Sequence, residues 1–484
     1  MNAQIRNVYG LFIVLFGLLV GFTSYWAVFD ADGLAENSDN RLALIEAQTI
    51  PRGRIYASDG RTELAVSRAE RRGQTRIFVR EYPFGGRFAH PVGYSFIQNG
   101  QRGLEKSRDE ELTGEEDEFE SIFSGLQGNA REGNDVITNL DVAGTEAAVA
   151  GLAGQKGAVV AIEPQTGKVR VMVSIPEYDP NLITSEFGRL NTDPNKPTLN
   201  RSTQELYPPG STFKVVTATA ALDSGKVTPE TIIDGSSPKE ISGTDLENSG
   251  GQSFGPVSLT DALTNSVNTV FAQLGEQVGA ETMVEYMKRF GFYEDPELDY
   301  PDGQMIPSGV RRDGTTYVED GFDVGRVAIG QGGSEGAIDV SPMQMALVAA
   351  AIGNGGRLMK PRLTDRVVAK DGRVQERIEP DLQSQVMKPE TAEQLAAMMS
   401  RVVEEGTGTA AALSGVRVAG KTGTAEVGAN REFTQPWFIC FAPVENPLLA
   451  VAVTVERQPP GSQGGTVAAP IARSVLEALL GGGA

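Results

Sequence analysis

Ser211 and Lys214, in the stretch Tyr-Pro-Pro-Gly-Ser-Thr-Phe-Lys, form the first candidate for catalysis. Proline cannot continue a helix interior and glycine permits a sharp entry, so Ser211 is expected where a helix begins. Lys214 lies three residues further on the same helix face, so its amine can reach the serine hydroxyl. Burial and the positive end of the helix dipole both lower the pKa of a lysine at this position. The pattern predicts a serine nucleophile, a neutral lysine as general base, and an oxyanion donor in the backbone N–H of Ser211.

The second candidate is the sequence Ser-Val-Asn that runs from Ser266 to Asn268. Thr260 or Asp261 is expected to cap a short helix, and Ser266 is expected to start the next one. The hydroxyl and the amide would then lie at a corner between two helices, where they can face a cleft. Ser266 could relay a proton between Lys214 and a leaving group, and Asn268 could hold a peptide carbonyl.

The third candidate is Lys421-Thr422-Gly423-Thr424, preceded by the apolar residues of a predicted strand. Its glycines leave room for the backbone of a ligand, which could add to the strand along its edge. The backbone N–H of Thr424 would be the second oxyanion donor. Lys421 and the hydroxyls of Thr422 and Thr424 would hold a carboxylate.

Two other stretches spell similar patterns without the required surroundings. Residues 236–239 read Ser-x-x-Lys, but Pro238 would break the helix that must set the spacing. Residues 38–40 read Ser-Asp-Asn, but they follow an apolar segment near the N-terminus and no helix is expected around them. Neither stretch is expected to take part in catalysis.

Each of the three candidates alone also fits an ordinary structure: a capping serine with a lysine extending to the surface, or a glycine turn with exposed polar residues. Their order and spacing together favour a catalytic role over these ordinary structures. The first two motifs are 266 − 211 = 55 residues apart, and the last two are 421 − 266 = 155 residues apart. This is the constellation of the penicilloyl serine transferases. The chain resembles the class B penicillin-binding proteins, and among them the short actinobacterial penicillin-binding protein A type.

The resemblance extends over nearly the whole chain. It includes the stretches IPRGRIYASDGRTELAVS, HPVGY, GLEKSRDEELTG, TGKVRVMVSIPEYDPN, LNRSTQELYPPGSTFK and AIGQGGSEGAIDVSPMQMALVAAAIGNGG. Val267 occupies a position where related serine enzymes often carry Asp, and class B members commonly vary there.

The resemblance implies an α+β fold: a penicillin-binding transpeptidase domain, similar to the serine β-lactamases, with a five-stranded antiparallel sheet flanked by helices. It implies that Ser211 attacks the penultimate D-Ala carbonyl of a peptidoglycan stem peptide while Lys214 takes its proton. D-Ala leaves with a proton passed through Ser266, and an amine of a neighbouring stem resolves the ester. β-Lactams would acylate Ser211 stably, and neither a metal nor an organic cofactor is needed.

The family also suggests partners, namely a separate membrane glycosyltransferase and other division or elongation proteins. A D,D-carboxypeptidase or a serine β-lactamase, in which water replaces the acceptor amine, would carry the same motifs. A β-lactam receptor that signals across the membrane and an inactive division scaffold are further alternatives. The segment before Tyr9 is too short for a signalling domain, and the complete set of motif residues argues against an inactive scaffold.

Composition limits the chemistry further. The net charge of −20 over 484 residues argues against nucleic acid as a partner, because phosphate binding needs basic stripes. The single Cys and single His exclude an internal disulfide and a Cys/His zinc cluster. Cys440 lies in an apolar run and is expected to pack in a buried strand. The resemblance assigns His90 to packing in the N-terminal module.

Tyr9 to Phe29 form 21 residues without a charge, enough for about 31 Å of helix, which matches the hydrocarbon thickness of a bilayer. Arg6 precedes this segment and gives slight support for an N-terminus inside the cell. A retained single-pass anchor in a bacterial cytoplasmic membrane is favoured over a cleaved signal peptide, with the catalytic domain outside the cytoplasm.

The predicted domains are a cytoplasmic tip and membrane anchor (1–30), a non-catalytic N-terminal module (31–135) and the transpeptidase domain (136–484). In the last domain Asp141 is expected to cap an alanine-rich helix. Two β-hairpins are expected, one whose turn is formed by residues 164–167 and one near the C-terminus, which is followed by a closing amphipathic helix.

Overall fold

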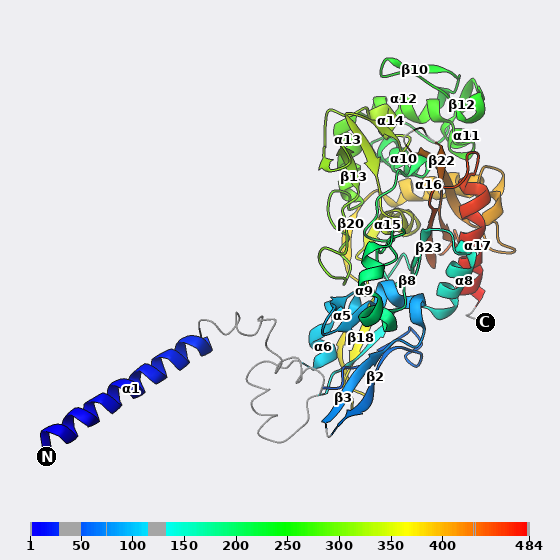
Figure 1. The fold of residues 1–484 in the computed structure, drawn as a ribbon. Coiled ribbons are helices and arrows are strands. Elements are labelled where there is room, and N and C mark those ends of the chain that lie inside the picture. The colour runs from blue at the N-terminus through cyan, green and yellow to red at the C-terminus, as the bar shows by residue number, and fades with distance from the viewer. Residues whose placement is uncertain are drawn as a thin grey trace.

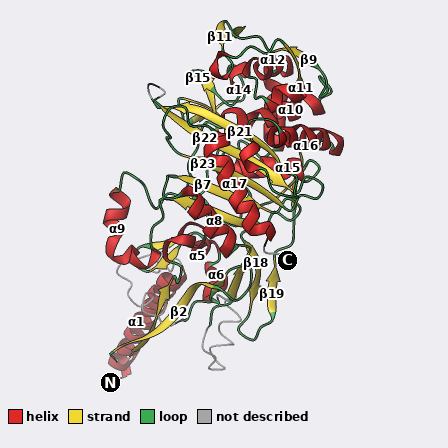
Figure 2. Ribbon diagram, turned by 90° about the vertical axis from the view of Figure 1, so that its right-hand side faces the viewer, coloured by secondary structure: helices red, strands yellow, loops and turns green. Residues whose placement is uncertain are grey.

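The computed structural model describes residues 2–28, 50–73, 75–114, 132–428, 430 and 432–481. Its largest unit is built on a five-stranded antiparallel sheet with the strand order β21-β22-β23-β7-β8. Figure 2 shows this sheet with helices packed around it. The strands are β7 (Gly157–Ile162), β8 (Val169–Ile175), β21 (Ala419–Val427), β22 (Phe433–Ala442) and β23 (Leu449–Val455).

Both faces of the sheet are covered, as the pattern along its strands requires. In β7, Val159 and Val160 are both fully buried but belong to different apolar clusters. Successive side chains of a strand point to opposite faces, so one cluster lies on each side of the sheet. The helices α8 (Val142–Leu152) and α17 (Gly464–Gly481) cover one face, and α15 (Pro342–Gly353) packs on the other.

A lobe of helices adjoins the β21 end of the sheet (Figure 2). Its central helix is α10, in which all ten residues, most of them small or β-branched, are buried. Two small two-stranded antiparallel sheets, β9–β12 and β10–β11, lie beside α12 at the top of Figure 1. The elements of the lobe are α10 (Lys214–Asp223), β9 (Ile232–Asp234), β10 (Lys239–Ile241), β11 (Thr244–Leu246), β12 (Pro256–Ser258), α11 (Leu259–Thr264), α12 (Asn268–Val278), α13 (Ala280–Arg289), α14 (Val324–Val327) and α16 (Pro389–Glu404).

Further short elements complete the domain. β13, β14, β15 and β16 form a four-stranded sheet, and β17 pairs with β20. The bounds are α9 (Ile183–Thr192), β13 (Gly309–Arg312), β14 (Thr316–Tyr317), β15 (Gly332–Gly333), β16 (Gly336–Asp339), β17 (Arg357–Met359) and β20 (Leu382–Gln385).

A second large sheet builds the N-terminal module, with the strand order β19-β18-β6-β1-β2-β3 (Figure 1). Two of its strands, β18 and β19, come from far along the chain, and β18 pairs with β6. The predicted boundary between residues 135 and 136 falls inside β6. The elements are β1 (Ile55–Tyr56), β2 (Glu63–Arg72), β3 (Thr75–Glu81), α4 (Ala89–Val92), β4 (Tyr94–Phe96), β5 (Gly100–Arg102), α5 (Leu104–Ser107), α6 (Asp109–Thr113), β6 (Asp135–Thr138), β18 (Thr364–Val368) and β19 (Val374–Arg377).

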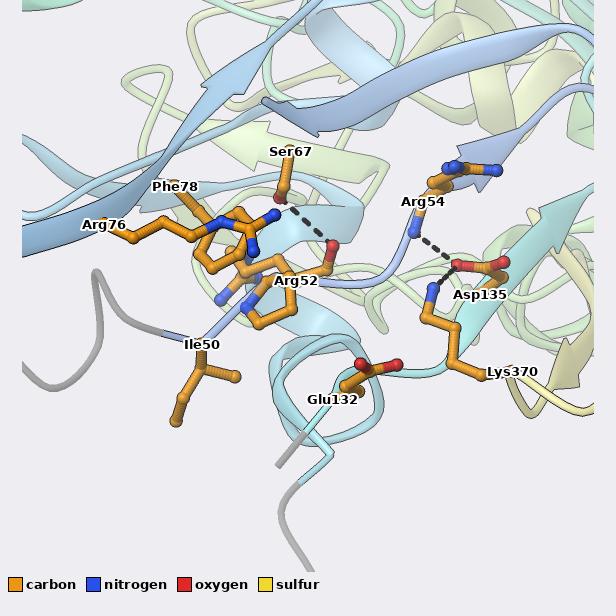
Figure 3. A pocket seen from close by; sticks show the side chains of 10 residues that line it. Ile50, Arg52, Arg54, Ser67, Arg76, Phe78, Glu132, Asp135 and Lys370 are labelled. Carbon is orange, nitrogen blue, oxygen red and sulfur yellow. Dashed lines mark hydrogen bonds and ion pairs between the residues drawn. The ribbon is translucent and has the colours of Figure 1, made fainter. Parts of the chain in front are cut away.

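Asp135 joins the early and late segments of this sheet. Its carboxylate accepts a hydrogen bond from the backbone N–H of Arg54 at 2.7 Å and another from the ammonium of Lys370, in the β18–β19 turn (Figure 3). A cavity of about 750 Å³ opens beside this junction, and its wall includes Arg52 and Arg76. The late strands are therefore bound to the module by side chains as well as by the strand ladder.

A buried carboxylate holds the centre of the N-terminal module. Glu105 is fully buried and accepts hydrogen bonds from the guanidinium groups of Arg52, at 3.0 Å, and Arg80, and from the hydroxyl of Tyr82 at 3.1 Å. Burial raises the pKa of Glu105, but the two arginine charges outweigh this and hold the pKa below its ordinary value. The carboxylate thus ties the loop before β1 to β3 and α5.

Several expectations about single residues are confirmed. Asp141 caps α8 by accepting a hydrogen bond from the Gly144 N–H at 2.8 Å. Cys440 is buried in β22, and both predicted hairpins and the closing helix α17 are present. His90 is buried in α4 with its ring edge-on to Tyr178, and burial lowers its pKa to about 3. A packing role for His90 follows.

The helix α1 (Asn2–Val28) contains the stretch Arg6–Tyr25, which has a mean hydropathy of 2.0 and is long enough to cross a bilayer. It fits the predicted single-pass anchor. Phe29 and residues 38–40 lie outside the described residues.

Candidate active site

Ser211 lies in a single turn of 3-10 helix, η3 (Gly210–Phe213), and Lys214 is the first residue of α10. Gly210 enters this turn at a φ of 53°, in the left-handed region that favours glycine. The predicted helix start at Ser211 is confirmed. The Ser211 side chain is partly exposed, and its hydroxyl has no hydrogen-bond partner among the residues that the structure describes. The hydroxyl is therefore available to a ligand.

Two contacts from other elements hold the turn that carries Ser211. The indole Nε1 of Trp437, in β22, donates a hydrogen bond to the carbonyl oxygen of Pro208 at 3.0 Å. The backbone N–H of Gly210 donates to the carbonyl oxygen of Gly330 at 3.0 Å. The turn is thus fixed on one side by the sheet and on the other by the segment after α14.

The amine of Lys214 is completely buried, with 0% of the residue exposed. It donates hydrogen bonds to the carbonyl oxygen of Ser266 at 2.7 Å and to Oδ1 of Asn268 at 2.8 Å, and it lies 3.3 Å from the Ser266 hydroxyl. Burial, aided by the nearby charge of Lys421, holds the pKa of Lys214 well below its ordinary value. The predicted neutral amine is consistent with this environment.

Ser266 lies at the corner between α11 and α12, as predicted. Its φ of 58° is in the left-handed region that serine rarely adopts. The predicted helix ends were wrong: Ser258, and not Thr260 or Asp261, caps α11, since its hydroxyl accepts a hydrogen bond from the Asp261 N–H at 3.1 Å. Ser258 has the extended backbone that an N-cap needs, whereas the next residues are already helical. α12 begins at Asn268, two residues after Ser266.

Lys421 projects from β21 towards the same corner. Its amine donates a hydrogen bond to the Ser266 hydroxyl at 2.9 Å and another to the carbonyl oxygen of Thr422 at 3.0 Å. The residue is 0% exposed, and burial lowers its pKa to about 7. The three predicted motifs therefore meet at one hydroxyl.

The rest of the third motif lies on β21, which is an edge strand of the five-stranded sheet. A Cβ atom on Gly423 would lie 2.6 Å from the carbonyl oxygen of Pro209, so only glycine lets this strand approach the Ser211 turn. The hydroxyl of Thr422 is 2.6 Å from that of Thr407, and the hydroxyl of Thr424 accepts a hydrogen bond from the Gly464 N–H at 3.1 Å.

Residues 157–477 match the family described as the penicillin binding protein transpeptidase domain. The chain belongs to this family. In this penicillin-binding protein, residues 52–136 also match the penicillin binding protein A dimerisation domain. The protein is 34% identical to the peptidoglycan D,D-transpeptidase PbpA of Mycolicibacterium smegmatis over 99% of each chain. It is 35% identical to the protein of that name from Mycobacterium tuberculosis over 100% of each chain.

Solved structures show the same fold. The ceftriaxone acyl-enzyme complex of penicillin-binding protein A from M. tuberculosis matches 90% of this penicillin-binding protein and 100% of the solved chain, with a TM-score of 0.81 and 32% identity. The D,D-transpeptidase domain of a peptidoglycan glycosyltransferase from Eggerthella lenta matches 90% and 99%, with a TM-score of 0.77 and 32% identity. The predicted family and the α+β fold with its five-stranded antiparallel sheet are confirmed.

Sequence reasoning missed the contacts that orient Asn268 in this penicillin-binding protein. The Nδ2 group of Asn268 donates a hydrogen bond to the carbonyl oxygen of Glu247 at 3.0 Å. Asn248, beside it, accepts a hydrogen bond from the Thr269 N–H at 3.0 Å. Glu247 and Asn248 lie in a polar loop without a recognisable motif, and an asparagine in a loop gives by itself no signal of such a role. In the discounted stretch 236–239, the Lys239 ammonium pairs with Asp234 at 2.7 Å.

Proposed function

We propose that this penicillin-binding protein is a peptidoglycan D,D-transpeptidase that cross-links stem peptides through an acyl-enzyme on Ser211. The observation that carries the proposal is the meeting of Lys214 and Lys421 at the Ser266 hydroxyl, next to the strand that approaches the Ser211 turn. The relatives named as peptidoglycan D,D-transpeptidases, and the solved β-lactam acyl-enzymes, support the same activity.

The base in this mechanism is the neutral amine of Lys214. A neutral amine has two hydrogens and one lone pair. The carbonyl oxygen of Ser266 and Oδ1 of Asn268 accept the two hydrogens, at 2.7 and 2.8 Å. The lone pair then remains for the proton of the Ser211 hydroxyl, which has no hydrogen-bond partner among the described residues and would be brought to the amine when substrate binds.

The acyl transfer proceeds in two steps. Ser211 Oγ attacks the penultimate D-Ala carbonyl, and the backbone N–H groups of Ser211 and Thr424 stabilise the oxyanion. The C–N bond to the terminal D-Ala breaks as that nitrogen receives a proton from Lys214 through Ser266. An amine of a second stem then attacks the ester and gives a proton to the neutral Lys214, which passes it to Ser211 Oγ as the ester C–O bond breaks. With a β-lactam the leaving nitrogen stays tethered to the acyl group, so the ester persists.

The donor stem peptide is held along β21. This strand is at the edge of the sheet, so an extended peptide can pair with its backbone. Lys421 and the hydroxyls of Thr422 and Thr424 would hold the terminal carboxylate, while Gly423 keeps the strand close to Ser211. The pKa of about 7 for Lys421 allows it to carry the positive charge that a carboxylate requires.

The apolar helix α1 would anchor the protein in the bacterial cytoplasmic membrane, with the catalytic domain on the outer side. We assign residues 1–30 to the tip and anchor, 31–135 to the N-terminal module and 136–484 to the transpeptidase domain, the sheet of the module being completed by β18 and β19. The partners would be a membrane glycosyltransferase, which supplies uncross-linked chains, and division or elongation proteins.

Fluorescent penicillin tests the nucleophile. The full chain should become labelled, and Ser211→Ala should abolish labelling while leaving the melting temperature unchanged. Labelling that survives this substitution would refute the role of Ser211. Incubation with lipid-linked substrate and a glycosyltransferase, followed by muropeptide analysis, tests the reaction. Cross-linked dimers are expected, whereas trimmed monomers alone would identify a carboxypeptidase.

A further inference from the structure

The side-chain amide of Asn268 is held in one orientation by two partners of opposite kind. Its Oδ1 accepts a hydrogen bond from the Lys214 amine at 2.8 Å, and its Nδ2 donates to the carbonyl oxygen of Glu247 at 3.0 Å. A carbonyl oxygen can only accept, so it selects the NH₂ end of the amide. The Glu247 carbonyl therefore determines that an oxygen, and not an NH₂ group, faces Lys214.

The position of the Glu247 carbonyl depends in turn on its neighbour Asn248. The Asn248 side chain is almost completely buried, and its Nδ2 donates to the carbonyl oxygens of Gly235 at 3.0 Å and Gln252 at 2.9 Å. Its Oδ1 accepts a hydrogen bond from the Thr269 N–H, in the first turn of α12, at 3.0 Å. One side chain thus ties three segments together beside Asn268.

Backbone contacts hold the loop as well: the Asn248 N–H donates to the Ser237 hydroxyl at 3.0 Å, and the Phe254 N–H donates to a carbonyl oxygen just after β9 at 3.1 Å. Residues 247–254 connect β11 to β12 at the top of the lobe, beside α12 (Figure 1). The side chains of Gln252 and Ser253 are exposed, and the apolar packing of the loop comes from Phe254, at the end far from Glu247. A buried asparagine with all of its amide hydrogen-bonding groups used by the backbone gives the loop a defined geometry.

We propose that Asn248 is a positioning residue for transpeptidation, which acts through the Glu247 carbonyl and Asn268 to direct the lone pair of Lys214. The inference rests on the proposed function, because it concerns the base of that reaction. Without Asn248 the loop carbonyl is no longer fixed, the Asn268 amide can rotate, and Lys214 loses one of the two acceptors that orient its lone pair. Substrate would still bind through its main contacts along β21, on which neither Asn248 nor Glu247 lies, although Asn268 would hold a peptide carbonyl less well.

The first experiment measures acylation of the full detergent-solubilised chain by a chromogenic β-lactam under single-turnover conditions. Asn248→Ala is expected to lower the maximal acylation rate about 10- to 100-fold, the range for a displaced proton-transfer group, while the half-saturating concentration changes less than threefold. Asn265→Ala is the matched control, because this exposed asparagine donates only to the carbonyl oxygen of Asp261 at 3.0 Å. The control should acylate at the wild-type rate.

The second experiment is a double-mutant cycle with Asn268→Ala. If Asn248 acts through Asn268, the double variant should acylate no more slowly than Asn268→Ala alone. If Asn248→Ala only loosened the lobe in general, the losses of acylation rate of the two single variants would multiply in the double variant. Multiplying losses, or a maximal rate of Asn248→Ala equal to that of the wild type, would overturn the inference.

A further variant keeps the test decisive if Asn248→Ala does not fold. Asn248→Asp retains the oxygen that accepts from the Thr269 N–H, and its charge is favourable at a helix N-terminus, but it cannot donate to Gly235 and Gln252. For this variant we expect the same loss of acylation rate. Combined with Asn268→Ala, it should again cause no further loss. If no β-lactam acylates the wild-type protein, the proposed function itself is wrong. If the wild type is acylated and Asn248→Asp is acylated at the same rate, only this inference is wrong.

Discussion

The amines of Lys214 and Lys421 meet at a single oxygen, the Ser266 hydroxyl, at distances of 3.3 and 2.9 Å. One lysine enters from a helix of the lobe and the other from the edge of the sheet, so the hydroxyl bridges the two parts of the domain. Two ammonium groups this close and this deeply buried repel each other. Burial and this repulsion favour a neutral Lys214 beside a Lys421 that titrates with a pKa of about 7.

Replacing Lys214 by arginine should slow acylation by several orders of magnitude. Guanidinium keeps its proton at any pH at which the protein is folded, so it cannot serve as a base. The planar group is also larger than the amine and would disturb Ser266 and Asn268. Stopped-flow acylation by a β-lactam measures the effect. Acylation of Lys214→Arg at the wild-type rate would remove Lys214 from the mechanism.

Burial of Lys421 should make stability depend on pH. Its pKa is about 7 in the fold and 10.5 ordinarily, so between these values the unfolded chain binds more protons than the native one. Stability then rises with pH across this window, by about 1.4 kcal/mol per unit. The pKa of Lys214 is lowered as well, so Lys214 contributes to the same rise. Lys421→Met should therefore reduce the rise without abolishing it, and the variant should be more stable than the wild type at pH 7, although inactive.

Thermal unfolding at pH 7 and pH 9 checks the Lys421 prediction. The exposed Lys106 provides the control, and Lys106→Met should leave the pH dependence as it is in the wild type. A pH dependence that persists undiminished in Lys421→Met would show that other groups cause it.

Gly330 should be intolerant of any side chain. Its φ is 76°, and a Cβ atom there would lie 1.9 Å from the carbonyl oxygen of Gly210. Gly330→Ala must push the Ser211 turn away, and a shift of about 1 Å costs on the order of 100-fold in rate. Gly333→Ala, with open space around its Cβ, should acylate normally in the same assay. Equal rates for the two variants would contradict this account of the turn.

Glu105 should matter for folding and not for chemistry. Glu105→Ala leaves the Arg52 and Arg80 charges without their buried partner, a loss expected to cost about 3–5 kcal/mol. Denaturant unfolding should show this loss, while the exposed Glu110→Ala stays near the wild type. At a temperature where the variant is folded, its acylation rate should be normal. A stable Glu105→Ala protein would show that the ion cluster is dispensable.

Local patterns in the sequence were sufficient to predict which motif residues of the site lie at a helix start and which lie in a strand. Proline and glycine before Ser211 define a helix start, and the apolar residues before Lys421 define a strand, so these residues could be placed without the fold. The left-handed φ of Ser266 could not be predicted from the sequence, because only the surrounding lobe stabilises it. Nor could the hydrogen bond from Lys421 to Ser266, since it joins residues 155 positions apart.

Contacts made by loops and by distant strands were the least predictable. Asn248 reaches α12 through its side chain, and no periodicity marks such a residue. The pairing of β18 with β6 joins residues more than two hundred positions apart, so the local pattern of each strand is the same whichever partner it has. The N-terminal module therefore looked continuous in sequence although its sheet is not.

The interrupted sheet also bears on how the molecule is made. A nascent chain that has only reached residue 138 lacks β18 and β19, so β6 is left as an open edge of unpaired backbone groups. That edge stays unprotected until the segment Thr364–Arg377 has left the ribosome, by which time the nucleophile and its helix have already emerged. The first part of the protein to be synthesised is thus among the last to be completed.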